Sequence, residues 1–424
     1  MNNEFPEAVH ASEPSPTGRL VLSLRALLWQ FLKIGTIGFG GGMAVIALME
    51  RDLVREKRAL DAEEFLHGVG LGQVLGPFAV NTALFVGNRL HGILGGLLCA
   101  GVFMAPSLLL VILLSRLYFS FHAIPALQDA IGGLGPVVIA LILSAAWSMG
   151  KKAVRHWPAV LLAMLALGLS VLKVNPVYIL ATAGAAGLLA GRSRLGGGSS
   201  PGASGKGEGF VHGQEKQSGG ERGIPTHLAS FSPILPVQTL AVTGSAAVVG
   251  GTSLTTLAWA FLKVGFIFFG GGFVLVPILH QRLVENLHWL TAKEFLDGVA
   301  ISNLTPGPIA VLATFAGYHL LGVPGAVVAT LALFAPALVL MSVFSHEYAR
   351  LKEGRRVQDF LAGITPAVVG LVVGAAVLLA PGALHGLPGW GLMVLSLILL
   401  VRFRWPPAFV LATGAALGAA GWIA

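Results

Sequence analysis

Charged residues are scarce in this sequence, and their scarcity excludes most soluble folds. Only 11% of the 424 residues are Asp, Glu, Lys or Arg, against about 25% in an average soluble domain, while 55% are hydrophobic. A water-exposed surface cannot be built from so few charges, whereas a lipid-exposed surface needs none. Apolar runs of about 20 residues, the length of a membrane-spanning helix, follow one another along the chain. We therefore expect an all-α polytopic membrane protein.

Other absences narrow the function. The single cysteine, Cys99, excludes an internal disulfide and an all-cysteine metal site, and the histidines lack paired metal-ligand spacing, so we expect no metal and no cofactor. No nucleotide-binding loop is present, and no catalytic pair of carboxylates or histidines occurs in the apolar runs, which argues against an enzyme. The net charge of +8 comes from Lys and Arg in loops between apolar runs, as in membrane proteins, so we expect no nucleic-acid partner.

An internal repeat is the strongest pattern in the chain. Residues 31–42 read FLKIGTIGFGGG and residues 261–272 read FLKVGFIFFGGG, an offset of 230. The same offset aligns Pro106 with Pro336, and many further Gly and Pro positions coincide. Because Gly and Pro determine backbone shape, the two copies are expected to share one fold.

The repeat divides the chain into five predicted segments. They are a disordered N-terminal tail (1–21), a first transporter repeat (22–191), a flexible basic linker (192–232), a weakly apolar stretch that could form an extra membrane helix (233–251) and a second repeat (252–424). The expected helices are 22–48, 66–87, 92–116, 130–149, 158–173 and 176–191, then 254–278, 296–317, 322–345, 360–380, 386–402 and 406–423. The extra helix would raise the number of spans from 12 to 13.

The distribution of Lys and Arg favours the larger number. If the N-terminus is cytoplasmic and the copies are parallel, the basic loops of the second copy, at 350–356 and 402–404, lie outside, against the positive-inside bias. A thirteenth span inverts the second copy and places these loops inside. We therefore expect inverted repeats, a common plan for transporters, and leave the parallel arrangement of 12 spans as the alternative.

Two equivalent lysines are the first candidates for a binding site. Lys33 and Lys263 each lie in an apolar run, where a charge is costly and by default functional. In inverted copies their ammonium groups could approach one central site and bind a dianion. The alternative is that each long side chain reaches back to the membrane surface.

Two pairs of helix breaks are the remaining candidates. The glycine runs Gly40-Gly41-Gly42 and Gly270-Gly271-Gly272 would interrupt the first helix of each copy and expose N–H groups that bind anions, unless they serve close helix packing. The second helices contain GQVLGPFAVN and SNLTPGPIAV, from residues 72 and 302. Breaks with polar residues at corresponding places of two halves indicate a transport site, whereas the alternative is a proline kink. The candidate binding residues there are Gln73, Pro77, Asn81, Asn303, Thr305, Pro306, Gly307 and Pro308.

With these motifs, the chain resembles the chromate ion transporter family in its long, two-domain form. The resemblance rests on GFGGG at 38–42, FFGGG at 268–272, Trp289 and TPGP at 305–308. It implies a secondary transporter that exports chromate or a related tetrahedral oxyanion across the cytoplasmic (inner) membrane as a multi-pass protein. The chain departs from the family pattern at Leu75, where a proline is expected.

Several alternatives remain open for the function and the partners. The chain could transport sulfate or another anion, or could be a membrane scaffold that transports nothing. The expected partners are a chromate-like or sulfate-like oxyanion and the lipid bilayer, with a homodimer left open.

Overall fold

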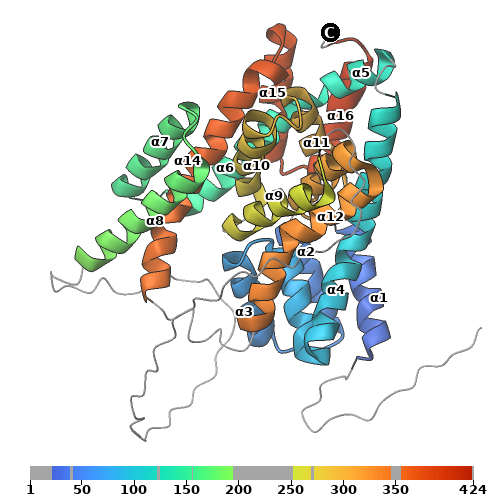
Figure 1. The fold of residues 1–424 in the computed structure, drawn as a ribbon, viewed down its shortest axis with the longest axis vertical. Coiled ribbons are helices and arrows are strands. Elements are labelled where there is room, and N and C mark those ends of the chain that lie inside the picture. The colour runs from blue at the N-terminus through green and yellow to red at the C-terminus, as the bar shows by residue number, and fades with distance from the viewer. Residues whose placement is uncertain are drawn as a thin grey trace, which may run out of the picture.

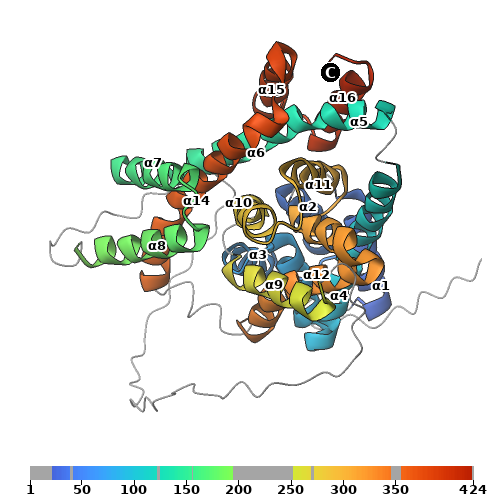
Figure 2. The same ribbon diagram turned by 45° about the horizontal axis from the view of Figure 1, so that its top comes forward.

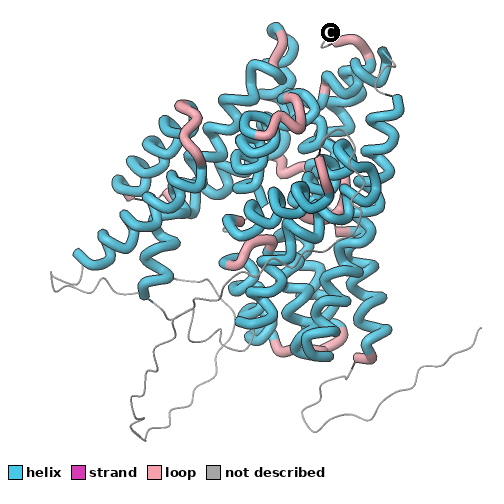
Figure 3. The backbone as a smooth tube through the Cα atoms, viewed as in Figure 1, coloured by secondary structure: helices cyan, strands magenta, loops and turns pink. Residues whose placement is uncertain are grey.

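The structure, a computed structural model, describes residues 22–38, 42–121, 125–154, 156–193, 252–268, 272–344 and 355–422. The described part is almost entirely helical and contains no β-strand (Figure 3). The predicted tail (1–21) and extra helix (233–251), and the predicted linker beyond its first two residues, lie outside the described residues.

The two repeats form matching series of helices. The first repeat comprises α1 (Leu24–Ile37), α2 (Gly42–Met49), the π-helix η1 (Glu50–Glu56), α3 (Ala62–Val74), α4 (Phe78–Phe121), α5 (Pro125–Gly132), α6 (Leu134–Ala153), α7 (Trp157–Val171) and α8 (Pro176–Ser193). The second comprises α9 (Leu254–Ile267), η2 (Gly272–Val274), α10 (Leu275–His280), the π-helix η3 (Gln281–Asn286), α11 (Ala292–Leu304), η4 (Ile309–Val311), α12 (Leu312–Phe344), α14 (Arg355–Ala383), α15 (Gly386–Val401) and α16 (Pro407–Ala419). The predicted repeat and the predicted breaks are both present.

The second predicted helix of each copy is a hairpin rather than a span. Glu64 at the start of α3 forms an ion pair with Arg89, and Gly68 packs against the ring of Phe85, so α3 and the first part of α4 run antiparallel. Gly76 has φ +119° at the tip, and Pro77 cannot continue a helix. The prediction of one helix over 66–87 is therefore wrong, and the prediction over 296–317 fails in the same way because Gly298 packs against Phe315.

The first predicted helix of the first copy is also a hairpin. The Gln30 side-chain amide donates a 2.6 Å hydrogen bond to Asp52, and both residues are buried. Residues 30 and 52 lie on either side of the break at 38–42, so α1 runs antiparallel to α2 and η1. The predicted continuous helix over 22–48 is consequently wrong.

α4 itself contains a sharp turn at His91 and Gly92, where Gly92 has φ +68°. Its two halves pack together through Gly87 and Gly95, because a Cβ on Gly87 would lie 2.5 Å from the Gly95 carbonyl oxygen. Four helical stretches of the described part are long and apolar enough to cross a membrane, namely 78–120, 128–151, 309–343 and 358–383.

The two repeats run in opposite directions. The His91 ring hydrogen-bonds the Leu22 carbonyl oxygen at one end of the long half of α4. At its other end, about 40 Å away for 27 helical residues, the ring of Phe119 contacts the ring of His319, with centroids 4.6 Å apart. His319 precedes the α12 turn that is equivalent to His91–Gly92, so the bases of the two repeats lie at opposite ends of the molecule. This arrangement confirms the predicted inversion.

We call these ends the repeat-1 end, marked by Leu22, Glu64 and His91, and the repeat-2 end, marked by Tyr118, Asp297 and His319. In Figure 1, α1 and α3 lie at the bottom, and α15 and α16 lie toward the top.

The last two helices of each repeat pack on the other repeat. α7 and α8 contact α14, while α15 and α16 contact α6, and α16 also contacts α5. Figure 2 shows α7 and α8 beside α14, to one side of the hairpin bundle. Glycines allow these contacts, since a Cβ on Gly363 would lie 2.1 Å from the Ala183 carbonyl oxygen, as is typical of helix packing in membranes. Because each repeat packs its last two helices on the other repeat, the two repeats are held together around the hairpin tips.

Candidate functional site

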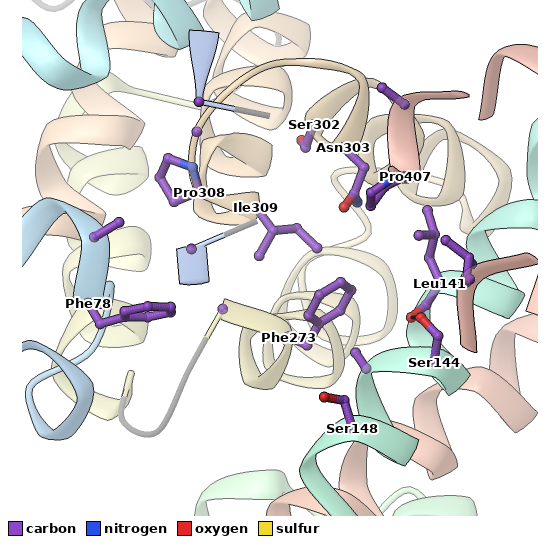
Figure 4. A pocket seen from close by; sticks show the side chains of 18 of the residues that line it. Phe78, Leu141, Ser144, Ser148, Phe273, Ser302, Asn303, Pro308, Ile309 and Pro407 are labelled. Atoms are coloured by element: carbon purple, nitrogen blue, oxygen red, sulfur yellow. Dashed lines mark hydrogen bonds between the residues drawn. The ribbon is translucent and has the colours of Figure 1, made fainter. Parts of the chain in front are cut away.

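The tips of four hairpins converge on one cavity of about 600 Å³. Gly38 and Pro77 come from the two tips of the first repeat, and Phe268 and Gly307 come from the two tips of the second. Figure 4 shows Pro308 and Ile309 facing Phe273 across the space, with Ser144 and Ser148 of α6 along another wall. The cavity therefore lies where the inverted repeats meet.

Four helices begin at the cavity wall. They start at Gly42 (α2), Phe78 (α4), Gly272 (η2, continuing into α10) and Ile309 (η4, continuing into α12), and all four residues line the cavity. The first N–H groups of a helix have no partner within the helix and carry partial positive charge. None of the described lining residues is Asp or Glu, so the wall favours an anion.

Two cations lie at the repeat-1 end of the cavity. Lys151 near the end of α6 and Arg404 in the turn before α16 line it, and both are exposed. The Lys151 ammonium lies 5.2 Å from the ring centre of Trp147, within the range of a cation–π contact. These charges raise the concentration of anions at the entrance.

In each repeat, the tip of the second hairpin contacts the opposite repeat. Gly76 (φ +119°) lies against the Phe268 carbonyl, and Gly307 (φ +120°) lies against the Ser107 side chain. The Thr305 hydroxyl donates to the Ser302 carbonyl oxygen at 3.0 Å. A change in how the repeats fit together would therefore move both tips.

Of the predicted site residues, seven line this cavity, namely Gly42, Pro77, Gly272, Asn303, Thr305, Gly307 and Pro308. Pro306 belongs to the same turn but is not in the lining. Asn81 is fully buried one turn beyond Phe78, and its side-chain amide has no hydrogen-bond partner in the described part. The remaining predicted glycines, Gly40, Gly41, Gly270 and Gly271, and the Gln73 side chain lie outside what the structure describes.

The two predicted lysines are not brought together. Lys33 and Lys263 are exposed, and neither lines the cavity. The Lys263 ammonium lies 5.0 Å from the ring centre of Trp259, one turn nearer the start of α9. A side chain directed back along its helix toward the membrane surface has the geometry of snorkelling.

Sequence reasoning missed much of the cavity wall, including Ser144, Ser148, Lys151, Phe273, Ile309 and Arg404. A signal for three of them is present, because Ser144, Ser148 and Lys151 follow at intervals of four and three residues and form one polar stripe on an otherwise apolar helix. In the sequence alone, the basic residues indicate only the orientation of the repeats.

Comparisons with known proteins agree with the repeat. Residues 25–188 and 255–419 each match the family model described as chromate transporter. The chain is 30% identical to the chromate transport protein of Cupriavidus metallidurans, over 93% of this chain and 92% of that protein. It is 29% identical to the probable chromate transport protein of Synechococcus elongatus, over 89% of each.

A shorter relative covers only part of the chain. The uncharacterized transporter YwrA of Bacillus subtilis is 25% identical over 162 residues, which are 37% of this chain and 89% of that protein. The length of the match is close to one repeat. No solved structure gives a significant match.

Proposed function

Because the chain belongs to the chromate transporter family, a family of membrane transporters rather than enzymes, we propose that it exports chromate or a closely related tetrahedral oxyanion as a secondary transporter. The observation that supports this most is the cavity between the hairpin tips. Its wall contains the start of four helices and no described carboxylate. The starts of broken helices facing a midplane site are a common way to bind anionic groups in transporters.

The chemistry of the wall suits an ion such as chromate. A tetrahedral dianion presents oxygen acceptors in four directions, and backbone N–H groups from several tips can donate to them from different sides. Asn303 and Ser144 add side-chain polar groups. We infer that no single residue holds the anion and that helix ends from both repeats share it.

The membrane potential can drive export. Two negative charges leaving a negative cytoplasm release about 4.6 kcal/mol per 100 mV, at about 2.3 kcal/mol per charge. This free energy favours outward movement without a nucleotide motor. The proposal therefore needs no energy source within the chain.

Charge asymmetry supports an orientation with the repeat-1 end in the cytoplasm. Among Lys and Arg with described side chains, seven lie at the repeat-1 end: Arg25, Arg51, Arg55, Lys57, Arg58, Arg89 and Lys151. Four lie at the repeat-2 end: Arg116, Lys173, Arg282 and Lys293. The positive-inside bias then places the repeat-1 end, toward which the cavity extends, on the cytoplasmic face of the inner membrane.

The proposed orientation also supports a crossing between the repeats. α8 ends beside the start of α14, at the repeat-1 end, whereas α9 begins at the repeat-2 end. We propose that the stretch 233–251 makes this crossing. In a Cys99→Ala background, a cysteine replacing Lys293 should react with an impermeant thiol reagent on intact cells, and one replacing Arg58 should not. The reverse result would overturn the orientation.

Purified protein in liposomes tests the transport proposal. With chromate inside and an imposed inside-negative potential, we expect chromate to leave at a rate that increases with the potential and to be inhibited by sulfate. Flux of sulfate but not chromate would retain the mechanism and change the substrate. Folded protein that moves neither ion under any gradient would reject transport of oxyanions and favour a scaffold.

A further inference from the structure

A second, much smaller cavity lies near the repeat-2 end. It measures about 20 Å³, barely the room for one water molecule. Its polar lining residues are Ser170 and Lys173 from the first repeat with His280, Gln281 and Glu285 from the second. One side of this cavity is formed by α7 and the turn that follows it. The opposite side is formed by the first hairpin of the second repeat, which contains α10 and η3.

The small cavity is the counterpart of part of the large one. Four residues that line it correspond, at the repeat offset of 230, to four that line the large cavity, in the pairs Ser170/Leu400, Val174/Arg404, Ala375/Ala145 and Leu378/Ser148. Inverted repeats give a transporter two equivalent half-paths, one toward each face. The large cavity measures about 600 Å³ and its counterpart about 20 Å³, so we infer that the half-path at the repeat-1 end is open and the half-path at the repeat-2 end is closed.

An ion pair closes the small cavity. The Lys173 ammonium lies 3.5 Å from the Glu285 carboxylate, and the Gln281 amide donates to the Lys173 carbonyl oxygen at 3.3 Å. Both contacts join the turn after α7 to η3. The equivalents of Lys173 and Glu285 at the open end are Phe403 and Arg55, and Arg55 pairs with Glu50 on its own helix instead.

We propose that this cavity is an oxyanion site on the outer half of the transport path, held shut by the Lys173–Glu285 ion pair. The inference rests on the proposed function and adds to it the residues of the exit. Once the Lys173 ammonium leaves Glu285, it can face the anion together with the Gln281 amide and the Ser170 hydroxyl. A dianion arriving from the tips competes with Glu285 for Lys173, which couples opening to the presence of the anion.

The test measures how often the cavity opens. Ser170 is buried, so in a Cys99→Ala background a cysteine replacing Ser170 should react slowly with an impermeant thiol reagent added at the outer face. Glu285→Gln should accelerate the reaction by about fivefold, the upper range for breaking a partly exposed ion pair. Molybdate, a tetrahedral dianion that does not oxidise thiols, should slow the reaction of the Glu285→Gln protein.

Matched controls separate the proposal from general loosening. Lys173→Arg keeps the ion pair and should leave the reaction slow. Glu50→Gln breaks the equivalent helix-local pair at the other end and should not change the reaction at position 170. Elution as one sharp peak in gel filtration confirms that each variant is folded.

Two results would overturn the inference. One is an unchanged reaction rate in folded Glu285→Gln, and the other is an accelerated rate that molybdate does not slow. Chromate flux is measured separately in the Cys99→Ala protein. If flux is present and either result is obtained, only the exit site is rejected, whereas a protein without flux rejects the proposed function itself.

Discussion

The Tyr118 hydroxyl donates a 2.8 Å hydrogen bond to the Asp297 carboxylate. The bond joins the far end of α4 to α11 of the other repeat, and Asp297 is only 3% exposed. It is therefore one of the contacts that hold the repeat-2 end together.

Removing this hydroxyl should weaken the fold. Tyr118→Phe leaves a buried carboxylate without its donor, which costs about 1–3 kcal/mol. The midpoint of thermal unfolding in detergent should fall by several degrees. Tyr178→Phe is the control, because Tyr178 is 68% exposed on α8, and its midpoint should not move. Equal midpoints for the two variants would show that the Tyr118–Asp297 bond carries no stability.

The glycines at the tips of the second hairpins should not tolerate a side chain. Gly76 and Gly307 have φ near +120°, and each touches the opposite repeat. Alanine at either position costs about 1–3 kcal/mol in backbone strain and displaces the tip, so we expect chromate flux to be lost or the protein to be unstable. Gly101→Ala is the control, since that glycine has open space around it. Normal flux and stability in Gly76→Ala and Gly307→Ala would contradict the tip geometry.

The cations at the cavity entrance should act at long range. Lys151→Ala and Arg404→Ala should each raise the KM for chromate by several-fold at low ionic strength, because the entrance loses attraction for the dianion. The effect should shrink at 0.15 M salt, where screening extends over only about 8 Å. Arg25→Ala removes an exposed charge at the same end that does not line the cavity, and should change KM little. A defect that salt does not alter would indicate a different role.

The lysines in the apolar runs provide a test of where the site lies. Lys33 and Lys263 do not line the cavity, so Lys33→Ala and Lys263→Ala should retain most of the chromate flux. A site built on two converging ammonium groups would lose flux in either variant. Initial rates in liposomes at matched protein content distinguish the two arrangements.

The fold could be predicted from the sequence to the extent that Gly and Pro control it. The offset of 230 predicted the repeat, the Lys and Arg pattern predicted the inversion, and the later helices, such as 176–191 and 386–402, agree with the structure to within about two residues. The hairpins could not be predicted, because a broken span and a hairpin share one hydropathy pattern. Only contacts such as Glu64–Arg89 separate them.

The candidate site was predicted in part for a related reason. A helix break such as Thr305–Pro308 can be predicted because its prolines cannot continue a helix. Residues of this break do line the cavity. Lys151 near the end of α6 and Arg404 in the turn before α16 are far apart in the sequence, and only the packing of α15 and α16 against α6 brings both to the entrance. Lys33 was predicted as a site residue because a charge in an apolar run is costly. Which way its side chain faces depends on how α1 packs, and α1 packs with Gly35 against the Phe103 backbone.

The most direct test of the account is to block the cavity chemically. In a Cys99→Ala background, a cysteine replacing Ser148 lies in the cavity wall, whereas one replacing Arg25 lies outside it at the same end. In vesicles with the repeat-1 end facing the reagent, chromate flux of each variant is compared before and after complete reaction with a bulky thiol reagent. The account predicts that flux falls to background for position 148 and persists for position 25. Full flux through protein completely labelled at position 148 would contradict passage of the oxyanion between the hairpin tips.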